Sequence, residues 1–339
     1  MENIKHNVRL TGPEISALWT QYLNDSMAIC VLTYALESCK DKDIYAVIEF
    51  ALSLSKTHIN KITEALKGEN YPSPKGFTME DVNLNAPPLF SETFWMQYLY
   101  VMTLHGMNGY SLSVGTSVRG DQREYFMKCN KEAMELYDKL VEVMLDKGIF
   151  SRSPFINAPH EQDVIDKQSY LTGWFGKRRP LNGIEMGHLY YNMQKTIVKI
   201  DLEIAFAQVT TSKELREYFQ KGAKICKKHI STFNSILTEN DLPSPRNWTS
   251  EISNTTIAPF SNKLMLFHVA SLIAVSVGYY GTALSVSQRR DIIAQYLRLM
   301  GEIGIYAEDG INLMIKNSWL EQPPSSDNRD TLAKKNHRL

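Results

Sequence analysis

The stretch Leu10–Trp19, LTGPEISALW, returns as LNGIEMGHLY at Leu181–Tyr190, and this repetition decides the architecture of the chain. Two further blocks repeat at the same offset of 171 residues: KTHI at Lys56 with KKHI at Lys227, and YPSPKGFT at Tyr71 with LPSPRNWT at Leu242. Beyond them a deletion shortens the offset to 170, which pairs Tyr110 with Tyr280. A period this long predicts a duplicated domain, because the units of a solenoid have about 20–50 residues.

Each copy has the apolar periodicity of long helices. In the second copy, for example, Leu215, Phe219 and Phe233 keep a helical spacing, and strand-like alternation is hard to find. We expect four helices in each copy, over residues 11–37, 42–68, 90–116, 121–147, 182–209, 213–239, 260–285 and 288–317. Long helices joined by short turns lie antiparallel and bury one apolar stripe each, so each copy predicts a bundle.

Only the connection between the second and third helices of each copy is long. It contains Pro72-Ser73-Pro74 in the first copy and Pro243-Ser244-Pro245 in the second, and these prolines favour an extended path. The predicted fold is therefore all-α, a tandem duplication of an up-and-down four-helix bundle with a long connection in each copy. The predicted domains are an N-terminal bundle (8–150), an interdomain linker (151–180), a C-terminal bundle (181–322) and a flexible tail (323–339). In the linker, Trp174 and Phe175 are expected to dock against a bundle.

Length and composition restrict the class of protein. A chain of 339 residues suits two hydrophobic cores, and 43% hydrophobic with 22% charged residues is ordinary for a globular protein. Lys plus Arg and Asp plus Glu both equal 37, which argues against nucleic acid as a partner. Without an apolar run of 18 residues or a signal-peptide pattern, we expect a cytoplasmic protein with no membrane span. The four cysteines form no CxxC pair and are expected to be reduced thiols, and a homo-oligomer stays open.

The histidines of the second copy are the most informative polar residues. His229 and His268 fall inside apolar helical stripes, and a buried imidazole needs either hydrogen-bond partners or a metal ion. If the four helices simply alternate up and down, His188, His229 and His268 come within roughly one helical turn of one another. If the long connection instead traverses the bundle, as in ferritin, His229 and His268 lie about 15 Å apart and share no site.

On the first of these two geometries the second copy holds a metal site. Three imidazoles, His188, His229 and His268, would meet the carboxylates of Glu308 and Asp309, a set that suits a divalent transition metal such as Zn, Fe, Ni or Mn. The alternative is that each histidine is an ordinary core residue with satisfied hydrogen bonds. Of the three, His188 fits least, because it projects away from the apolar face of its helix.

The first copy predicts a weaker second site. Its candidate ligands are Glu14, His58, Tyr98 and Asp138, with His105 two turns away on the same face as Tyr98. At the positions of His188 and His268 this copy has Ala17 and Tyr98, so its ligand set is depleted.

Several long blocks, in this order, resemble a known family over nearly the whole chain. The blocks are LTGPEISALWTQYLNDSM at Leu10, the PSP segment, LTGWFGKRRPLNGIE at Leu171, APFSNKLMLFHV at Ala258, YGTALSVSQRRD at Tyr280 and IYAEDGINLMIKNSWLEQPP at Ile305. The family is an uncharacterised one, a domain of unknown function, made of tandem four-helix proteins from endospore-forming bacteria. The resemblance implies bundles of the kind sometimes grouped with ferritin-like folds, and metal binding. Carried over residue by residue, the implied ligands are Glu185, His188, His229, His268, Glu308 and Asp309.

Two functions of different classes follow. The leading hypothesis is a cytoplasmic metal-binding helical protein, or a metalloenzyme with water or substrate at an open position of a mononuclear His/carboxylate site. The alternative is a non-catalytic structural or sporulation-associated interaction protein with metal-free bundles. A ferroxidase is the weakest hypothesis, because a di-iron site needs paired Glu-x-x-His motifs and Glu185-x-x-His188 stands alone.

Overall fold

The computed structural model of the protein describes residues 8–336. Its long helices form two sets of four: α1 (Gly12–Ser38), α2 (Lys42–Gly68), α3 (Glu92–Thr116) and α4 (Gly120–Asp146), then α5 (Gly183–Val209), α6 (Lys213–Thr238), α7 (Asn262–Val286) and α8 (Arg290–Lys316). Each end lies within two residues of its predicted position. No β-strand occurs between residues 8 and 336, so the predicted all-α duplicated bundle is confirmed.

The long connections, the interdomain linker and the C-terminal tail carry short helices. Three single turns are 3-10 helices, η1 (Met79–Asp81), η2 (Gln168–Leu171) and η3 (Thr249–Glu251), and the C-terminal tail contains α9 (Arg329–Asn336). The predicted docking of the linker aromatics is wrong, because the side chains of Trp174 and Phe175 are 57% and 90% exposed.

The long connection runs the whole length of each bundle. At the start of α3 the Glu92 carboxylate accepts hydrogen bonds from the backbone N–H groups of Lys40 (2.7 Å) and Asp41 (3.1 Å), at the start of α2. In the second copy, the Thr210 hydroxyl at the end of α5 donates to the Asn262 amide oxygen at the start of α7 (2.8 Å). The second and third helices of each copy are therefore parallel. The common height of His188, His229 and His268, which was predicted for helices that alternate up and down, does not apply.

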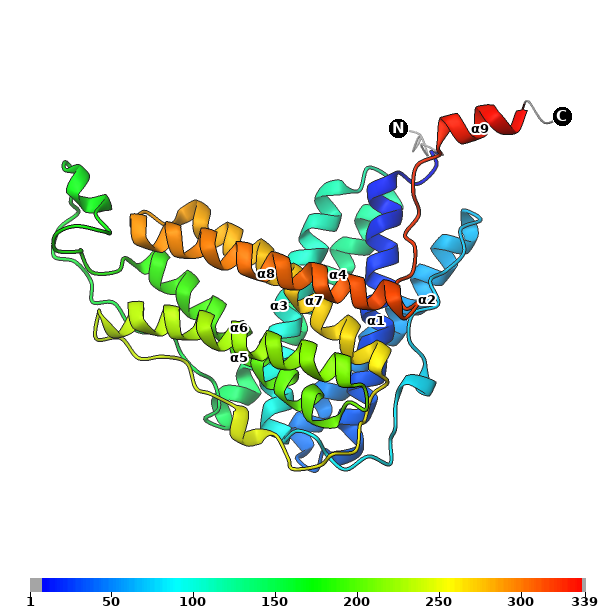
Figure 1. Ribbon diagram of the computed structural model, residues 1–339, viewed down its shortest axis with the longest axis horizontal. Helices are drawn as coiled ribbons and strands as arrows, with labels where there is room; N and C mark the ends of the chain where they lie inside the picture. The colour runs from blue at the N-terminus through cyan, green and yellow to red at the C-terminus, as the bar shows by residue number, and fades with distance from the viewer. Residues whose placement is uncertain (1–7, 337–339) are drawn as a thin grey trace, which may run out of the picture.

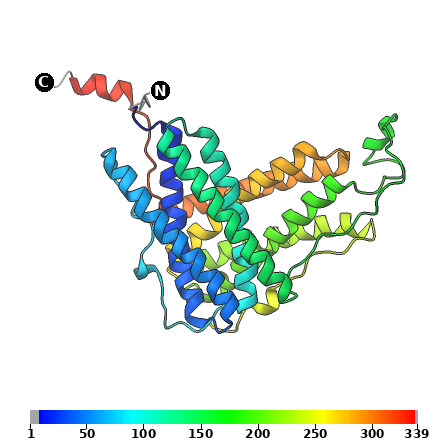
Figure 2. The same ribbon diagram turned by 180° about the vertical axis from the view of Figure 1, so that it is seen from behind.

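The two bundles cross, and their free ends diverge (Figures 1 and 2). At the crossing the two long connections pair in antiparallel fashion through β-bridges between Val82 and Phe260 and between Phe90 and Ile252. Val82 and Ile252 are equivalent in the repeat, as are Phe90 and Phe260. Each backbone hydrogen bond of this pairing therefore has an equivalent bond on the other side of a pseudo-two-fold axis, as in the interface of a symmetric dimer.

Apolar packing joins the copies into one body. The largest core cluster contains buried side chains from both bundles, including Leu99 of α3, Phe206 of α5 and Leu266 of α7. A smaller cluster fills the free end of each bundle, around Leu18 in the first copy and Leu189 in the second. The two cores expected from the chain length are therefore continuous with each other, because the crossing buries a face of each bundle against the other.

Helix α7 is the most apolar of the long helices. Among the helices between residues 8 and 336, it is the one long and apolar enough to cross a membrane by length and composition. It packs against α5 and α8, and Leu264, Leu266 and Val269 are fully buried. A central core helix needs the same composition as a membrane span, so this property by itself assigns no membrane.

Candidate metal centre

The two central histidines of the predicted C-terminal site face different partners. The His229 ring in α6 lies 3.1 Å from the Tyr280 hydroxyl (Nδ1) and 3.4 Å from the Glu302 carboxylate (Nε2). His268, near the start of α7, shares a 3.1 Å hydrogen bond with the Tyr98 hydroxyl of the first copy. Because α6 and α7 are parallel, the two imidazoles differ in height along the bundle by about 15 Å.

The repeated glutamates cap helices. Glu14 Oε1 accepts the backbone N–H groups of Val118 (2.9 Å) and Arg119 (2.8 Å), at the start of α4. Glu185 Oε1 makes the equivalent bonds to Gln288 (3.0 Å) and Arg289 (2.9 Å), at the start of α8. Burial raises the pKa of Glu185, but hydrogen bonds from the Arg179 side chain and from these amides outweigh it and hold the pKa below its usual value. The repeated Glu therefore joins the first helix of each copy to the fourth.

The other predicted ligands are also dispersed. His188 is half-buried on α5, the Glu308 side chain is exposed, and Asp309 accepts a hydrogen bond from the Lys221 ammonium (2.6 Å). In the first copy, Asp138 is exposed on α4, and the His105 ring lies 5.4 Å from the ring of Tyr279. The structure therefore does not bring the six predicted C-terminal ligands together, and of the weaker set it places only His58 in a cluster of ligand groups.

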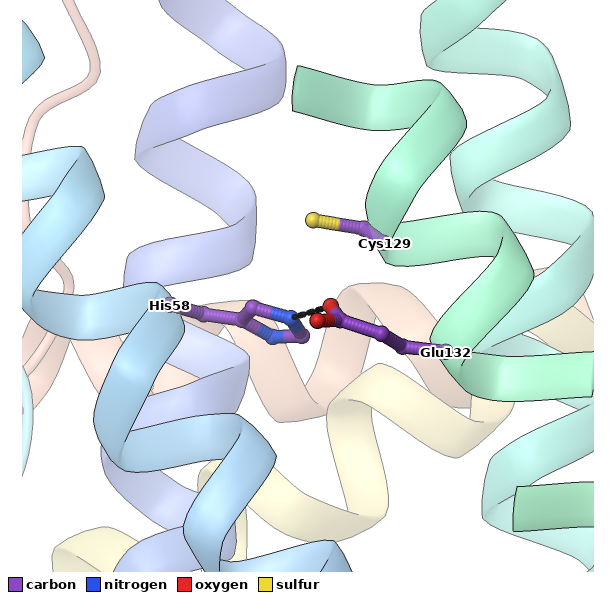
Figure 3. Close-up of side chains that lie close together, drawn as sticks. All are labelled: His58, Cys129 and Glu132. Carbon is purple, nitrogen blue, oxygen red and sulfur yellow. Dashed lines mark hydrogen bonds and ion pairs between the residues drawn. The ribbon is translucent and has the colours of Figure 1, made fainter. Parts of the chain in front are cut away.

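That cluster lies in the middle of the first bundle. Between residues 8 and 336, the His, Cys and carboxylate side chains that converge are His58, Cys129 and Glu132, with one ligand atom of each within 4.8 Å of the others. Figure 3 shows the His58 ring extending from α2 toward α4, where Cys129 and Glu132 lie on adjacent turns. His58 Nε2 is 3.0 Å from Glu132 Oε2, and His58 and Cys129 are both buried.

A second carboxylate reaches the other side of the imidazole. Asp25 Oδ2 of α1 lies 3.3 Å from His58 Nδ1, yet neither atom has a hydrogen bond with good geometry anywhere in the described part of the chain. The Ser55 hydroxyl donates to Asp25 Oδ1 (2.9 Å) and so orients this carboxylate. Nδ1 and Oδ2 thus face each other as an imidazole–carboxylate pair, the arrangement that orients histidine ligands in metal sites.

A shell of polar and aromatic side chains supports these groups. The Gln21 amide lies 3.7 Å from Cys129 Sγ as a donor and accepts a hydrogen bond from the Tyr125 hydroxyl (3.1 Å). The rings of Tyr110 and Tyr125 pack edge-on against the His58 ring, at centroid distances of 6.0 and 6.3 Å. All four helices of the bundle therefore contribute to the centre or to the groups that orient it.

The helical spacing explains how these residues meet. Asp25 and Gln21 are one turn apart in α1, Ser55 and His58 are one turn apart in α2, and Cys129 belongs to the buried stripe of α4. Glu132 follows Cys129 by three residues, at the edge of that stripe, and its side chain is 19% exposed. A signal for the site was present in the sequence, because Gln21 and Asp25, one turn apart, place two polar side chains among the apolar residues of their helix.

The electrostatics of the centre favour a cation. Burial opposes a charge on His58, but hydrogen bonds and charges from Asp25 and Cys129 outweigh it and raise the pKa of the imidazole to about 11. A metal ion is the other cation that such a donor set can hold, and it would bind in place of the imidazole proton.

The donor set fits zinc. Zn²⁺ prefers thiolate, imidazole and carboxylate ligands in tetrahedral geometry, with adjacent ligand atoms about 3.3–3.8 Å apart. His58, Cys129 and Glu132 need only small shifts to reach that spacing, and Asp25, beside Nδ1 on the other side of the ring, would orient the imidazole. Three protein ligands would leave one coordination position for a water molecule.

The sequence profile described as "Protein of unknown function (DUF3231)" matches residues 1–161 and, a second time, residues 169–332. The chain belongs to the DUF3231 family. A crystal structure of a "putative spore coat protein" from Bacillus halodurans C-125 is 17% identical and covers 45% of this chain and 99% of its own, with a TM-score of 0.41. No curated protein matches the chain significantly.

The second DUF3231 copy keeps only part of the centre. His58, Tyr110 and Glu132 have identical equivalents in His229, Tyr280 and Glu302. Five positions differ: Thr196 replaces Asp25, Cys226 replaces Ser55, Leu299 replaces Cys129, Asn192 replaces Gln21 and Gln295 replaces Tyr125. Glu302 is in addition paired with Lys228 (2.8 Å) and Arg298 (2.6 Å). The second copy of this DUF3231 protein therefore lacks the thiol and the second carboxylate of the centre.

Proposed function

We propose that this protein binds one divalent transition-metal ion, in first place Zn²⁺, in its N-terminal bundle. His58, Cys129 and Glu132 are the ligands, and Asp25 orients the His58 ring from its opposite side. The observation that carries the proposal is the convergence of a thiol, an imidazole and a carboxylate in a helical core, with a second carboxylate behind the imidazole. A reduced thiol is required, which fits a cytoplasmic location.

The role of the ion is structural rather than catalytic. The ion would lie between buried side chains of the core, His58 and Cys129, where substrate has little access. The ligands come from α2 and α4, and Asp25, which orients His58, comes from α1, so the centre would join three of the four helices of the bundle. The function supported best is thus that of a metal-stabilised, non-catalytic helical scaffold.

Elemental analysis of the full chain, purified without added metal, tests the proposal. We expect about one zinc per chain in the wild-type protein and less than about 0.2 in Cys129→Ser or Glu132→Gln. The matched control is His229→Gln, which changes the equivalent histidine of the second copy and should leave the metal content unchanged. Loading with Co²⁺ adds an independent readout, because thiolate ligation gives a sulfur-to-cobalt absorption band that Cys129→Ser removes.

A metal-free ion-pair network is the competing function of the same residues. In that case a protonated His58 is held between Asp25 and Glu132, and the protein should contain less than about 0.2 metal per chain whether or not the ligands are changed. A protein that also fails to take up added Zn²⁺ or Co²⁺, while its circular dichroism shows an intact fold, would overturn the metal proposal.

A further inference from the structure

The outward side of α8 is apolar although it faces solvent. Helix α8 packs against α6 and α7, and its other side lies at the front of the molecule in Figure 1. On that side Leu297, Ile305, Ile311 and Ile315 are 57%, 66%, 46% and 58% exposed. Single exposed apolar residues are common, but these four together form a patch on the order of 400 Å², and patches of that size are often functional.

The exposed positions of α8 repeat with the spacing of a coiled-coil seam. Steps of four and three residues alternate along positions 297, 301, 304, 308, 311 and 315, which places their side chains in one line along the helix. The residues of this seam are Leu297, Gly301, Gly304, Glu308, Ile311 and Ile315, and all are exposed. A seam of this kind packs against a second helix, whereas α8 presents it to the outside.

Two glycines lie in the middle of the seam. A Cβ atom on Gly301 or Gly304 would meet no atom within 4 Å, so nothing in the described part of the chain requires glycine there. Glycine in the middle of a helix is destabilising relative to alanine. A second helix that approaches along the seam gives these glycines a use, because the absence of a Cβ lets two backbones come close together.

The duplication provides a comparison, because α4 is the equivalent helix of the first copy. At five positions on this side of the helix, α8 has an uncharged residue where α4 has a charged one. The α4 residues are Arg123, Glu124, Lys131, Glu135 and Glu142, and their equivalents in α8 are Ile293, Ala294, Gly301, Ile305 and Asn312. The fourth helix of a bundle therefore forms with an ordinary charged outer surface, and packing within the bundle does not explain the apolar one.

The order of residues in the seam fits a second copy of this chain. In an antiparallel pair with a two-fold axis at residue 306, Leu297 faces Ile315 of the second copy, Gly301 faces Ile311, and Gly304 faces Glu308. Each glycine then lies opposite a large side chain, and leucine meets isoleucine at both ends of the seam. Glu308, the one charged residue of the seam, lies over a glycine, where its carboxylate can still reach solvent.

The flanks of the seam argue against a membrane surface as the partner. Arg298 is paired with Glu302 (2.6 Å) and Lys316 with Glu214 (2.8 Å), so the basic residues beside the apolar side are already neutralised. Helices that lie on membranes instead carry unpaired Lys and Arg beside their apolar face.

We propose that two copies of this chain associate through the seams of their α8 helices, antiparallel and about a two-fold axis. Two patches of about 400 Å², with the polar residues at their rims, bury on the order of 1,000 Å² in total, which is the lower end of specific interfaces. An interface of this size is typical of weak association, so we expect a dissociation constant on the order of 10 μM. The metal centre lies in the first bundle and contains none of these residues, so the two proposals are tested independently.

Sedimentation equilibrium of the full chain, from about 2 to 200 μM, tests the proposal. We expect monomers and dimers in a concentration-dependent equilibrium. Gly301→Lys with Ile305→Glu, which introduces the residue types found at the equivalent positions of α4, should raise the dissociation constant at least tenfold, by an order-of-magnitude estimate. The matched control is Met127→Lys with Met134→Glu, which places the same charges on the exposed side of α4 and should leave the dissociation constant unchanged.

Replacing the glycines by alanine gives a second test, with two effects of opposite sign. Gly301→Ala with Gly304→Ala should weaken the dimer, because the added methyl groups keep the backbones apart. The same change should raise the melting temperature of the monomer at low concentration, because alanine is the better helix former. A raised melting temperature with an unchanged dissociation constant would contradict a close contact at the glycines.

Disulfide trapping tests the antiparallel register. On oxidation with diamide, chains with Leu297→Cys should crosslink to chains with Ile315→Cys. Either variant alone should not crosslink, because identical positions then lie about 27 Å apart at opposite ends of the pair. The wild-type chain is the control for its four native cysteines. A wild-type chain that stays monomeric, a dimer unaffected by the charges on α8, or crosslinks between identical positions overturns the proposal.

Discussion

The two copies place a histidine at the same position and give it opposite properties. In the first copy, Asp25 and Cys129 raise the pKa of His58 to about 11 against the effect of burial. In the second, burial and the charge of Lys199 lower the pKa of His229 to about 4. The frame of imidazole, tyrosine and glutamate is the same in both, so the charge of the neighbours decides which copy can hold a cation.

Grafting the missing ligands should have the largest effect on this difference. Thr196→Asp with Leu299→Cys installs the carboxylate and the thiol of the first copy beside His229 and Glu302. We expect the zinc content to rise from about one to about two per chain, because structural zinc sites have apparent binding free energies on the order of 10 kcal/mol. Elemental analysis measures the change. An unchanged content in a folded double variant would show that Lys228 and Arg298 still neutralise Glu302.

The second largest effect is expected from equivalent ion pairs of the two copies, which should contribute differently to the free energy of unfolding. Arg289 is fully buried and binds Asp291 (2.7 Å), whose side chain is 7% exposed, whereas the Asp121 partner of Arg119 is 57% exposed. Asp291→Asn removes the 2.7 Å partner of a buried charge and leaves only the Glu239 carboxylate at 3.8 Å, so it should cost about 3 kcal/mol of unfolding free energy. Asp121→Asn should cost about 0–1 kcal/mol. Denaturant unfolding compares them, and equal losses would contradict the burial argument.

Acid should act on the second copy through His229. Its neighbours are Tyr280 of α7, Lys199 of α5, and Glu302 and Arg298 of α8. His229 binds a proton less readily in the folded state than in the unfolded state. Its contribution to the free energy of unfolding is therefore complete above pH 6.5 and is lost as pH falls through about 4. We expect a loss of up to about 3 kcal/mol over that range.

Urea unfolding at a series of pH values measures this loss. His229→Gln should flatten the dependence between pH 6.5 and 4, because glutamine has no proton to bind. A wild-type slope that the substitution leaves unchanged would assign the acid sensitivity to other groups.

The smallest of these effects concerns one methyl group in the sixth helix. A Cβ on Gly222 would lie 2.1 Å from the Tyr306 hydroxyl and 2.3 Å from Glu203 Oε1, whereas the equivalent residue of the first copy is Ala51. Gly222→Ala should therefore destabilise the protein by about 1–2 kcal/mol, although alanine is the better helix former. Ala51→Gly should lower the free energy of unfolding by about 1 kcal/mol, because glycine loses more conformational entropy than alanine when it enters a helix. Thermal unfolding tests both, and a stabilised Gly222→Ala protein would contradict the crowding.

The sequence predicted the helices closely because apolar spacing and repeated blocks are local signals. The candidate metal centre was not predicted, because the path of the long connection sets the direction of α3 and therefore the height of the α4 residues in the bundle. Pro72 and Pro74 indicate an extended segment, but they do not say whether that segment returns to the same end of the bundle. The contacts of Glu185 could not be predicted for a related reason, since its partners are the Arg179 guanidinium and backbone amides that any sequence would provide. His58 was placed among the candidates, whereas Cys129 and Glu132 were not.

The paired connections also bear on the ancestry of the molecule. Because equivalent backbone groups make each contact twice, a single copy carries both halves of the surface and would associate face to face with another such copy. Fusion of two genes replaces that concentration-dependent encounter with a permanent one-to-one pairing. The residues on the two sides of the axis can then become different. Tyr98 and His268 show this, because they occupy equivalent positions of the repeat and form a hydrogen bond with each other across the axis.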